Sequence, residues 1–396
     1  MAITINSPEG DRSSGSAINN PKVRGLVYQV FTIAILLALI GFVIHNTVEN
    51  LRASNQPFGF SFLGGRAGFN LGQALIPFSS DSTNINALVV GLLNTILIAI
   101  SGIIAATIIG FIVGIGRLSH NWLIAKLCQA YVELFRNIPP LLVIFFWYSG
   151  VLVLLPQARE ALHLPFSSYL SNRGLAFPNP IFGAGMWAVG IAVVVAIIAI
   201  FFVARWAHRR QATTGKQFHT ISAAVAIFIG LPLLTFFAAG MPLSFDYPVA
   251  GKFNLTGGSV IGPEFISLFL ALSFYTASYI AEIVRGGIRA VAKGQSEAAG
   301  ALGLRSGAIT RLIVIPQAMR IIIPPLTSQY LNLTKNSSLA IAIGYADLVA
   351  VGGVILNQSG RAIEVFIIWM LVYLALSIAT SLFMNWFNAK MALVER

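Results

Sequence analysis

The sequence predicts an all-α protein that crosses a membrane about eight times, and two observations lead to this fold class. First, 57% of the 396 residues are hydrophobic and only 10% are charged, with a mean hydropathy of +0.81, a balance that no ordinary soluble domain has. Second, apolar runs long enough to cross roughly 30 Å of hydrocarbon recur along the chain. They lie near residues 25–45, 87–116, 123–155, 183–204, 219–240, 263–284, 312–333 and 363–387.

These runs divide the chain into five regions. Residues 1–20 are polar and rich in Ser, Asn and Gly, so residues 1–24 are predicted to form a disordered cytoplasmic tail. The tail lacks the pattern of a cleaved signal, so we expect the first span to be retained as an anchor. The other regions are a first transmembrane helix with an external loop (25–86), a membrane core in two parts (87–155 and 263–396), and an insertion with two extra transmembrane helices (156–262).

The net charge of +12 reflects topology and not nucleic-acid binding. With the N-terminus inside, sixteen Lys and Arg residues fall on the cytoplasmic side and five on the external side, as the positive-inside rule expects. Both termini and residues 290–316 are therefore predicted to be cytoplasmic. A ninth crossing near residues 338–356 would move the C-terminus outside. We expect a broken or re-entrant segment over residues 334–360 instead, because polar residues and glycines interrupt it.

No catalytic or metal-binding pattern is present. Cys128 is the single cysteine, which excludes a disulfide framework and a cysteine metal cluster. The chain contains no G-x-x-x-x-G-K-[ST], H-E-x-x-H or G-x-S-x-G sequence, so it encodes no nucleotide-binding loop and none of these catalytic sites. We expect a protein that is not an enzyme and that has no metal site.

A short cytoplasmic helix is predicted around Glu297. Ser296 is a favoured N-cap, which would place the Glu297 carboxylate in the first turn, at the positive end of the helix dipole. Ala298 and Ala299 are good helix formers whose small side chains let another protein approach closely. Gly303 suits a left-handed C-cap. A helix of under about three turns is not stable alone in water, so it should need a docking surface.

The same residues match E-A-A-x3-G-x9-I-x-L-P, with Ile315 in place of the leucine. This resembles the EAA loop of bacterial ABC importer permeases, the cytoplasmic segment that contacts a separate ATPase subunit. The alternative is an ordinary loop helix between two spans, since short motifs match by chance. The glycine and the Ile-x-Ile-Pro sequence at matching offsets argue against a chance match. The resemblance assigns ATPase coupling to Gly294, Ser296, Glu297, Ala298, Ala299, Gly303, Leu304 and Pro316.

Further stretches resemble the polar amino acid permeases within that family. They are E-L-F-R-N-I-P-P-L-L at 133–142, A-S-Y-I-A-E-I-V-R-G-G-I at 277–288, and the residues from Lys293-Gly294-Gln295 to Lys335–Leu339. The resemblance covers roughly residues 84–150 and 263–390 and implies a type I ABC importer-like permease core with one crossing near 334–360. The spans within 151–262 depart from the compact five-helix form. Long chains of this kind are similar to one permease of the general L-amino acid or glutamate/glutamine/aspartate/asparagine importers of proteobacteria.

The resemblance also implies partners and a location. ATP and Mg would be held by a homodimer of ATPase subunits, so no cofactor is expected in this chain. A second, different permease would complete a heterodimer, and a periplasmic binding protein would deliver the amino acid substrate. The chain would lie in membrane lipid, in the bacterial inner membrane, with no nucleic acid partner. Which amino acids it carries is left open, because in such systems selectivity resembles a property of the binding protein.

Ionisable residues in apolar segments are costly in lipid and are therefore candidates for a translocation pathway. Glu133 and Arg136 share a helix face, where they are either substrate groups or a structural ion pair, and the prolines at 139 and 140 should break their helix. Glu282 is expected to form a local pair with Arg285 or act in a gate. The candidates are Glu133, Arg136, Asn137, Tyr275, Tyr279, Lys335, Asn336, Ser337 and Asp347. The alternative for the tyrosines is packing, and for the last four a structural anchor.

Two other function classes compete with the importer. One is a secondary amino acid transporter driven by an ion gradient. The buried charges favour it, whereas the missing internal repeat and the EAA match argue against it. The other is a membrane scaffold without transport, which the predicted broken helices disfavour.

Overall fold

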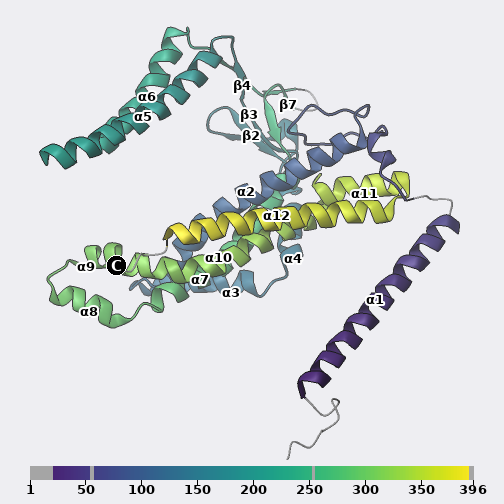
Figure 1. Ribbon diagram of the computed structural model, residues 1–396. Helices are drawn as coiled ribbons and strands as arrows, with labels where there is room; N and C mark the ends of the chain where they lie inside the picture. Colours follow the sequence, from purple (N-terminus) through teal and green to yellow (C-terminus); the bar gives the residue numbers. More distant parts are fainter. Residues whose placement is uncertain (1–20, 54–57, 252–254, 392–396) are drawn as a thin grey trace, which may run out of the picture.

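The computed structural model describes residues 21–53, 58–251 and 255–391, and it is predominantly helical (Figure 1). Within these residues, seven helices are long and apolar enough to cross a membrane, or eight when a sharply bent pair counts as one span. The predicted number of crossings is therefore confirmed by length and composition. Residues 1–20 of the predicted tail lie outside the described residues, and residues 21–24 belong to the first helix.

A central bundle surrounds the close pair of α2 (Asn84–Gly116) and α7 (Pro263–Arg289). Small residues permit this closeness. A Cβ atom at Gly110 would lie 2.6 Å from the Ile280 side chain, and one at Gly114 would lie 2.7 Å from the Ala281 carbonyl oxygen. Ile280 is fully buried, as is Leu268 on the same helix. The buried core therefore lies along this helix pair.

One span of the bundle is broken. It consists of α3 (Trp122–Arg136), followed after three residues by α4 (Pro140–Phe145) and the π-helical turn η3 (Phe146–Leu152). The two halves are bent by 108°. Pro139 has extended backbone and Pro140 occupies the first helical position, where proline is tolerated because its missing N–H has no partner there. The predicted break at the two prolines is confirmed.

The second part of the core continues after α7 with a series of short and long helices. Its elements are α8 (Lys293–Ala301), α9 (Ser306–Ile309), η5 (Thr310–Val314), α10 (Ile315–Asn336), η6 (Ser337–Ile343), α11 (Leu348–Ser359) and α12 (Ala362–Met391). Gly344 has a φ of +78°, ends η6 and turns the chain. With 12 residues, α11 is about 18 Å long, too short to cross a bilayer alone. The predicted interruption within 334–360 is thus present.

The insertion combines two long helices with short strands that the sequence analysis missed. α5 (Met186–Thr214) and α6 (Thr220–Ala238) form a hairpin, preceded by η4 (Ala158–Glu160). Strands of two to four residues are too short to show a reliable alternation in sequence. They are β1 (Leu162–Leu164), β2 (Ser168–Ser171), β3 (Gly174–Phe177), β4 (Asn179–Phe182), β5 (Leu243–Asp246), β6 (Val249–Ala250), β7 (Leu255–Thr256) and β8 (Ser259–Ile261).

These strands connect the two sides of the insertion to the bundle. Antiparallel pairing gives a sheet in the order β1-β2-β3-β8 and two separate pairs, β4 with β5 and β6 with β7. β8 leads directly into α7, so the strands lie at the end of the bundle where α7 begins. The α5–α6 hairpin projects away from it, and α1 (Pro21–Ala53) stands apart on another side (Figure 1). The short η2 (Ser61–Gly64) follows α1 in the chain.

Candidate functional site

The predicted coupling helix is present as α8, with 9 residues. Ala299 is buried at 3% exposure, whereas Glu297 and Ala298 are exposed. Gly303 has a φ of +78° and its N–H donates to the Gly300 carbonyl at 2.9 Å. The short length and the left-handed glycine after the helix are as predicted. α8 therefore docks through Ala299 and presents Glu297 and Ala298 outward.

The start of this helix differs from the prediction. α8 begins at Lys293 with Ala292 as its N-cap, so Ser296 is an interior residue and Glu297 lies in the second turn. The assignment of Ser296 as N-cap was wrong. A serine cap contributes only about 1 kcal/mol, and docking of the helix on the bundle outweighs such a local preference.

A groove of about 620 Å³ lies between α8 and the adjoining end of the bundle. It is lined by Leu118, His120, Ile288, Arg289, Val291, Lys293, Ser296, Glu297 and Val314. Beside α8, Leu302 is 83% exposed and adds an apolar side chain to the rim of this groove. Sequence reasoning missed Leu302; its position directly after the helix, before the glycine, was the available signal. Groove and leucine together form a surface suited to a partner protein.

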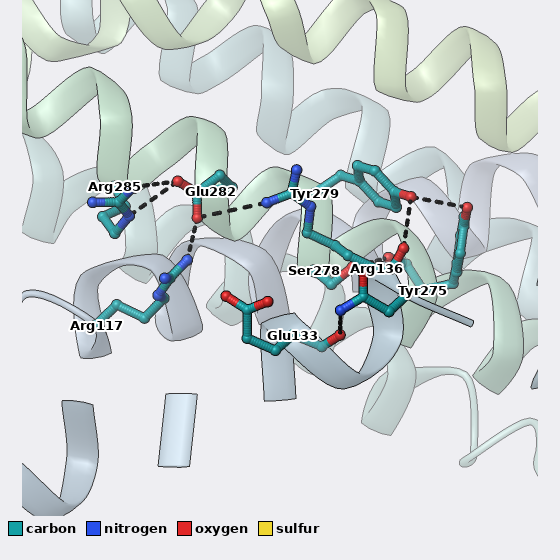
Figure 2. Close-up of polar contacts among 9 residues, drawn as sticks. Arg117, Glu133, Arg136, Tyr275, Ser278, Tyr279, Glu282 and Arg285 are labelled. Atoms are coloured by element: carbon teal, nitrogen blue, oxygen red, sulfur yellow. Dashed lines mark hydrogen bonds and ion pairs between the residues drawn. The ribbon is translucent and has the colours of Figure 1, made fainter. Parts of the chain in front are cut away.

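A charged cluster joins three helices of the bundle. Figure 2 shows the Glu282 carboxylate of α7 between the guanidinium groups of Arg117, at the end of α2, and Arg285. Arg136, from the end of α3, approaches the same carboxylate at 4.0 Å. The predicted local pair of Glu282 and Arg285 is confirmed. Arg117 was missed as a partner, because the 165 residues that separate it from Glu282 conceal the contact.

Arg136 and two tyrosines form a second group next to this cluster. The Arg136 guanidinium lies 5.4 Å from the centre of the Tyr279 ring, and the hydroxyl groups of Tyr275 and Tyr279 are 3.1 Å apart. Asn137 donates to the Glu133 carbonyl at 2.8 Å. Among the described residues, Glu133 and Arg136 form no ion pair with each other, so the structural pair considered from the sequence is absent. Glu133, Arg136 and Asn137 are all exposed.

The break in the span lies beside the middle of α7. The Tyr131 hydroxyl donates to the Phe274 carbonyl at 2.6 Å, and the Phe135 and Phe274 rings stack with centroids 6.0 Å apart. Phe274 is near the centre of the 27 residues of α7. The exposed end of α3 consequently lies beside α7, between its middle and Glu282.

The remaining predicted pathway residues lie elsewhere. Leu348, next to Asp347, donates its N–H to Thr95 at 3.1 Å, and Thr95 is 22 residues before Arg117, about 33 Å along α2. Asp347 is fully buried. Its carboxylate accepts from the Ala350 N–H at 2.8 Å and so caps α11.

The neighbours of Asp347 have mixed exposure. Ser337 is buried and donates to the Thr334 carbonyl at 2.7 Å, whereas Asn336, the last residue of α10, is half-buried. Lys335 is exposed and lines a hollow of about 380 Å³ together with Ser338, Val349, Phe366, Trp369, Met370 and Tyr373. Within the described residues, Lys335 and Asp347 form no ion pair. The structure therefore separates these four residues from the group at Glu133 and Arg136.

A bundle of apolar helices with a short helix docked at one end and charged groups at a broken span has the architecture of a transporter subunit. Residues 217–393 match the family described as "Binding-protein-dependent transport system inner membrane component". The chain is 71% identical to the "General L-amino acid transport system permease protein AapQ" of Rhizobium johnstonii, over 96% of this chain and 95% of that protein. The chain belongs to the family of amino acid ABC transporter permeases.

Two further relatives extend over nearly the whole chain. The "Putative amino-acid ABC transporter permease protein YhdX" of Escherichia coli is 47% identical over 95% of this chain and 96% of its own length. The "Glutamate/glutamine/aspartate/asparagine transport system permease protein BztB" of Rhodobacter capsulatus is 38% identical over 100% of both. The insertion is thus covered by these alignments, and the family does not favour a secondary transporter.

Proposed function

We propose that this chain carries polar L-amino acids across the bacterial inner membrane as one of two permease subunits, with both termini in the cytoplasm. A second permease completes the pathway, a dimer of ATPase subunits binds Mg and ATP and hydrolyses the ATP, and a periplasmic binding protein delivers the substrate. The names of the three relatives, which are amino acid permeases, support the substrate class. The exposed surface of α8 supports a cytoplasmic protein partner.

The observation that carries the proposal is the group of exposed charges at the broken span. We place Arg136 and Glu133 within the depth of the membrane, because α3 ends beside the middle of α7, and neither side chain is withdrawn from the surface. Charged groups at that depth are too costly to face lipid, and irregular backbone is tolerated only where it lines a cavity or is covered by protein. This face therefore borders the second permease and a water-filled pathway.

The same group has the charges needed for an amino acid. The Arg136 guanidinium lies 4.0 Å from its nearest carboxylate, so it retains donors for a substrate carboxylate, for which its planar fork is well suited. The Glu133 carboxylate, three residues earlier, is available for the substrate ammonium group. The hydroxyls of Tyr275 and Tyr279 are adjacent polar groups that orient the ligand. The break at Asn137–Pro139 leaves main-chain groups outside the helical hydrogen-bond pattern, and contacts of the substrate with these groups complete the site.

Coupling follows from the chain connections. α8 begins four residues after the end of α7, and the groove beside it is lined by residues of both α7 and α8. When ATP closes the partner ATPases, a displacement of α8 is transmitted to α7, which carries Tyr279 and Glu282. The contacts of Glu282 with α2 and α3 then change, and the bundle alternates between two states biased by ligands.

The proposal is tested by uptake of labelled L-amino acids into proteoliposomes that contain all four components, with and without internal ATP. Glu297→Lys should abolish ATP-dependent uptake while the chain remains folded. Arg136→Gln should lower uptake about tenfold, the effect of one lost charge-assisted contact. Lys126→Gln, the same charge change at an exposed position of α3, is the matched control and should have little effect.

Two outcomes would contradict the proposal. Uptake driven by an ion gradient without the ATPase would identify a secondary transporter. Equal loss of uptake in the Arg136 and Lys126 variants would remove the group at the broken span from the pathway.

A further inference from the structure

The cytoplasmic end of the α5–α6 hairpin is a strongly basic segment without acidic neighbours in sequence. No Asp or Glu occurs between Glu160 and Asp246. Within the described part of the chain, other arginines form ion pairs with Glu282, Glu364 or Asp81. The basic side chains at the end of the hairpin have no such partner there and are exposed. They are Arg205, Arg209, Arg210 and Lys216.

The lengths of the two helices place these cations at the level of lipid headgroups. The external ends are level with each other, because the Gly183 N–H donates to the Pro242 carbonyl at 3.0 Å. α6 has 19 residues and α5 has 29, which are about 28 Å and 43 Å. Because the hydrocarbon core is about 30 Å thick, α6 is just long enough to cross it and begins at the inner boundary of the core. The longer α5 continues beyond this boundary. That boundary falls near Arg205.

An aromatic contact marks the same level independently. The Trp206 ring of α5 lies 5.3 Å from the Phe218 ring, centroid to centroid, just before α6 begins. The Arg210 guanidinium lies 5.2 Å from the Trp206 ring centre. Tryptophan is enriched where the hydrocarbon meets the headgroups. Arg210 is therefore held beside an interfacial aromatic residue and not extended freely into the cytoplasm.

The arginines of α5 occupy a broad face of the helix end, away from the bundle. At 100° per residue, Arg205, Arg209 and Arg210 spread over about 140° of the helix circumference. The hairpin also stands apart from the bundle, with its free end on the side of α8 and α9 (Figure 1). We propose that the basic end of the α5–α6 hairpin binds anionic phospholipid headgroups of the cytoplasmic leaflet and thereby anchors the insertion in the membrane.

The positive-inside rule explains why cations lie on the cytoplasmic side, but it does not predict which lipids the folded protein prefers. A lipid site predicts that preference. Each Lys or Arg near a negatively charged leaflet contributes about a fivefold increase in binding. Four unpaired cations should therefore produce a preference for phosphatidylglycerol over phosphatidylcholine that exceeds tenfold.

The test is native mass spectrometry of the full-length chain, alone and in the assembled transporter, titrated with phosphatidylglycerol or phosphatidylcholine. One variant replaces all four cations by glutamine. A second variant replaces the three arginines by lysine. Arg159→Gln with Arg173→Gln, which removes charge on the external side, is the matched control. A second measurement on the unmodified protein compares sodium chloride with inorganic phosphate at equal ionic strength.

We expect the glutamine variant to lose the preference at least tenfold, and the lysine variant and the external control to keep it. In the unmodified protein the preference should weaken with ionic strength equally in both salts. Equal binding of the two lipids, or an unchanged preference in the glutamine variant, would overturn the proposal. So would specific displacement by inorganic phosphate, which would indicate a free-phosphate site, or loss of the preference on assembly, which would indicate an acidic partner protein.

Discussion

Replacing Glu282 by glutamine should destabilise the bundle, because it leaves buried arginines without their counter-charge. The Arg117 side chain is 12% exposed, that of Arg285 is 23% and that of Glu282 is 28%. Removing one member of a fully buried ion pair costs about 3–5 kcal/mol. Since this cluster is partly exposed, we expect Glu282→Gln to lower the free energy of unfolding by about 2–3 kcal/mol. Arg117→Gln should cost less, because Glu282 keeps Arg285.

A double-mutant cycle isolates the contact between α2 and α7. Unfolding of Arg117→Gln, Glu282→Gln and the double variant would be followed in mixed micelles by titration with a denaturing detergent. We expect a coupling energy of about 1–2 kcal/mol for residues in one ion-pair network. The control cycle is Arg66 with Asp81, an external pair whose side chains are 66% and 78% exposed, for which about 0.5 kcal/mol or less is expected. Equal coupling in both cycles would refute the reasoning.

Three further predictions concern single positions. Gly114→Ala should lower the free energy of unfolding by about 1–3 kcal/mol, because the added methyl group forces α2 away from α7. Gly190→Ala is the control: its Cβ would meet nothing within 4 Å, so it should be neutral or slightly stabilising in the same unfolding titration. Asp347→Ala should cost about 1 kcal/mol through the lost cap of α11, and asparagine at 347 should restore most of it; no rescue would argue against a capping role. Ala299→Leu should speed hydrogen exchange across α8 because the site is buried. Ala298→Leu should leave exchange unchanged and weaken ATPase binding. The reverse pattern would contradict the docking geometry.

The helical spans were predictable because each is a continuous local signal. An apolar run of about twenty residues has few structures available in a bilayer, so the existence and order of the spans agree between sequence and structure. The helices α1 and α5, with 33 and 29 residues, extend beyond the apolar runs predicted at 25–45 and 183–204. The break at Pro139 was predictable for the same reason, since proline acts on its own turn. The strands of the insertion were not, because a strand of two to four residues is stabilised by partners distant in sequence. β3 pairs with β8, for example, across the entire hairpin.

The sequence by itself determined the membrane class, the short helix that ends before Gly303 and the break in the span, since composition, Gly303 and the proline pair act locally. Only the tertiary structure decided which charges meet. Arg136 approaches Glu282 and not Glu133, Arg117 joins a carboxylate 165 residues away, and Asp347 caps a helix. The physical reason is that an ion pair depends on distance in space, which is set by the packing of α2, α3 and α7 and leaves no pattern along the chain.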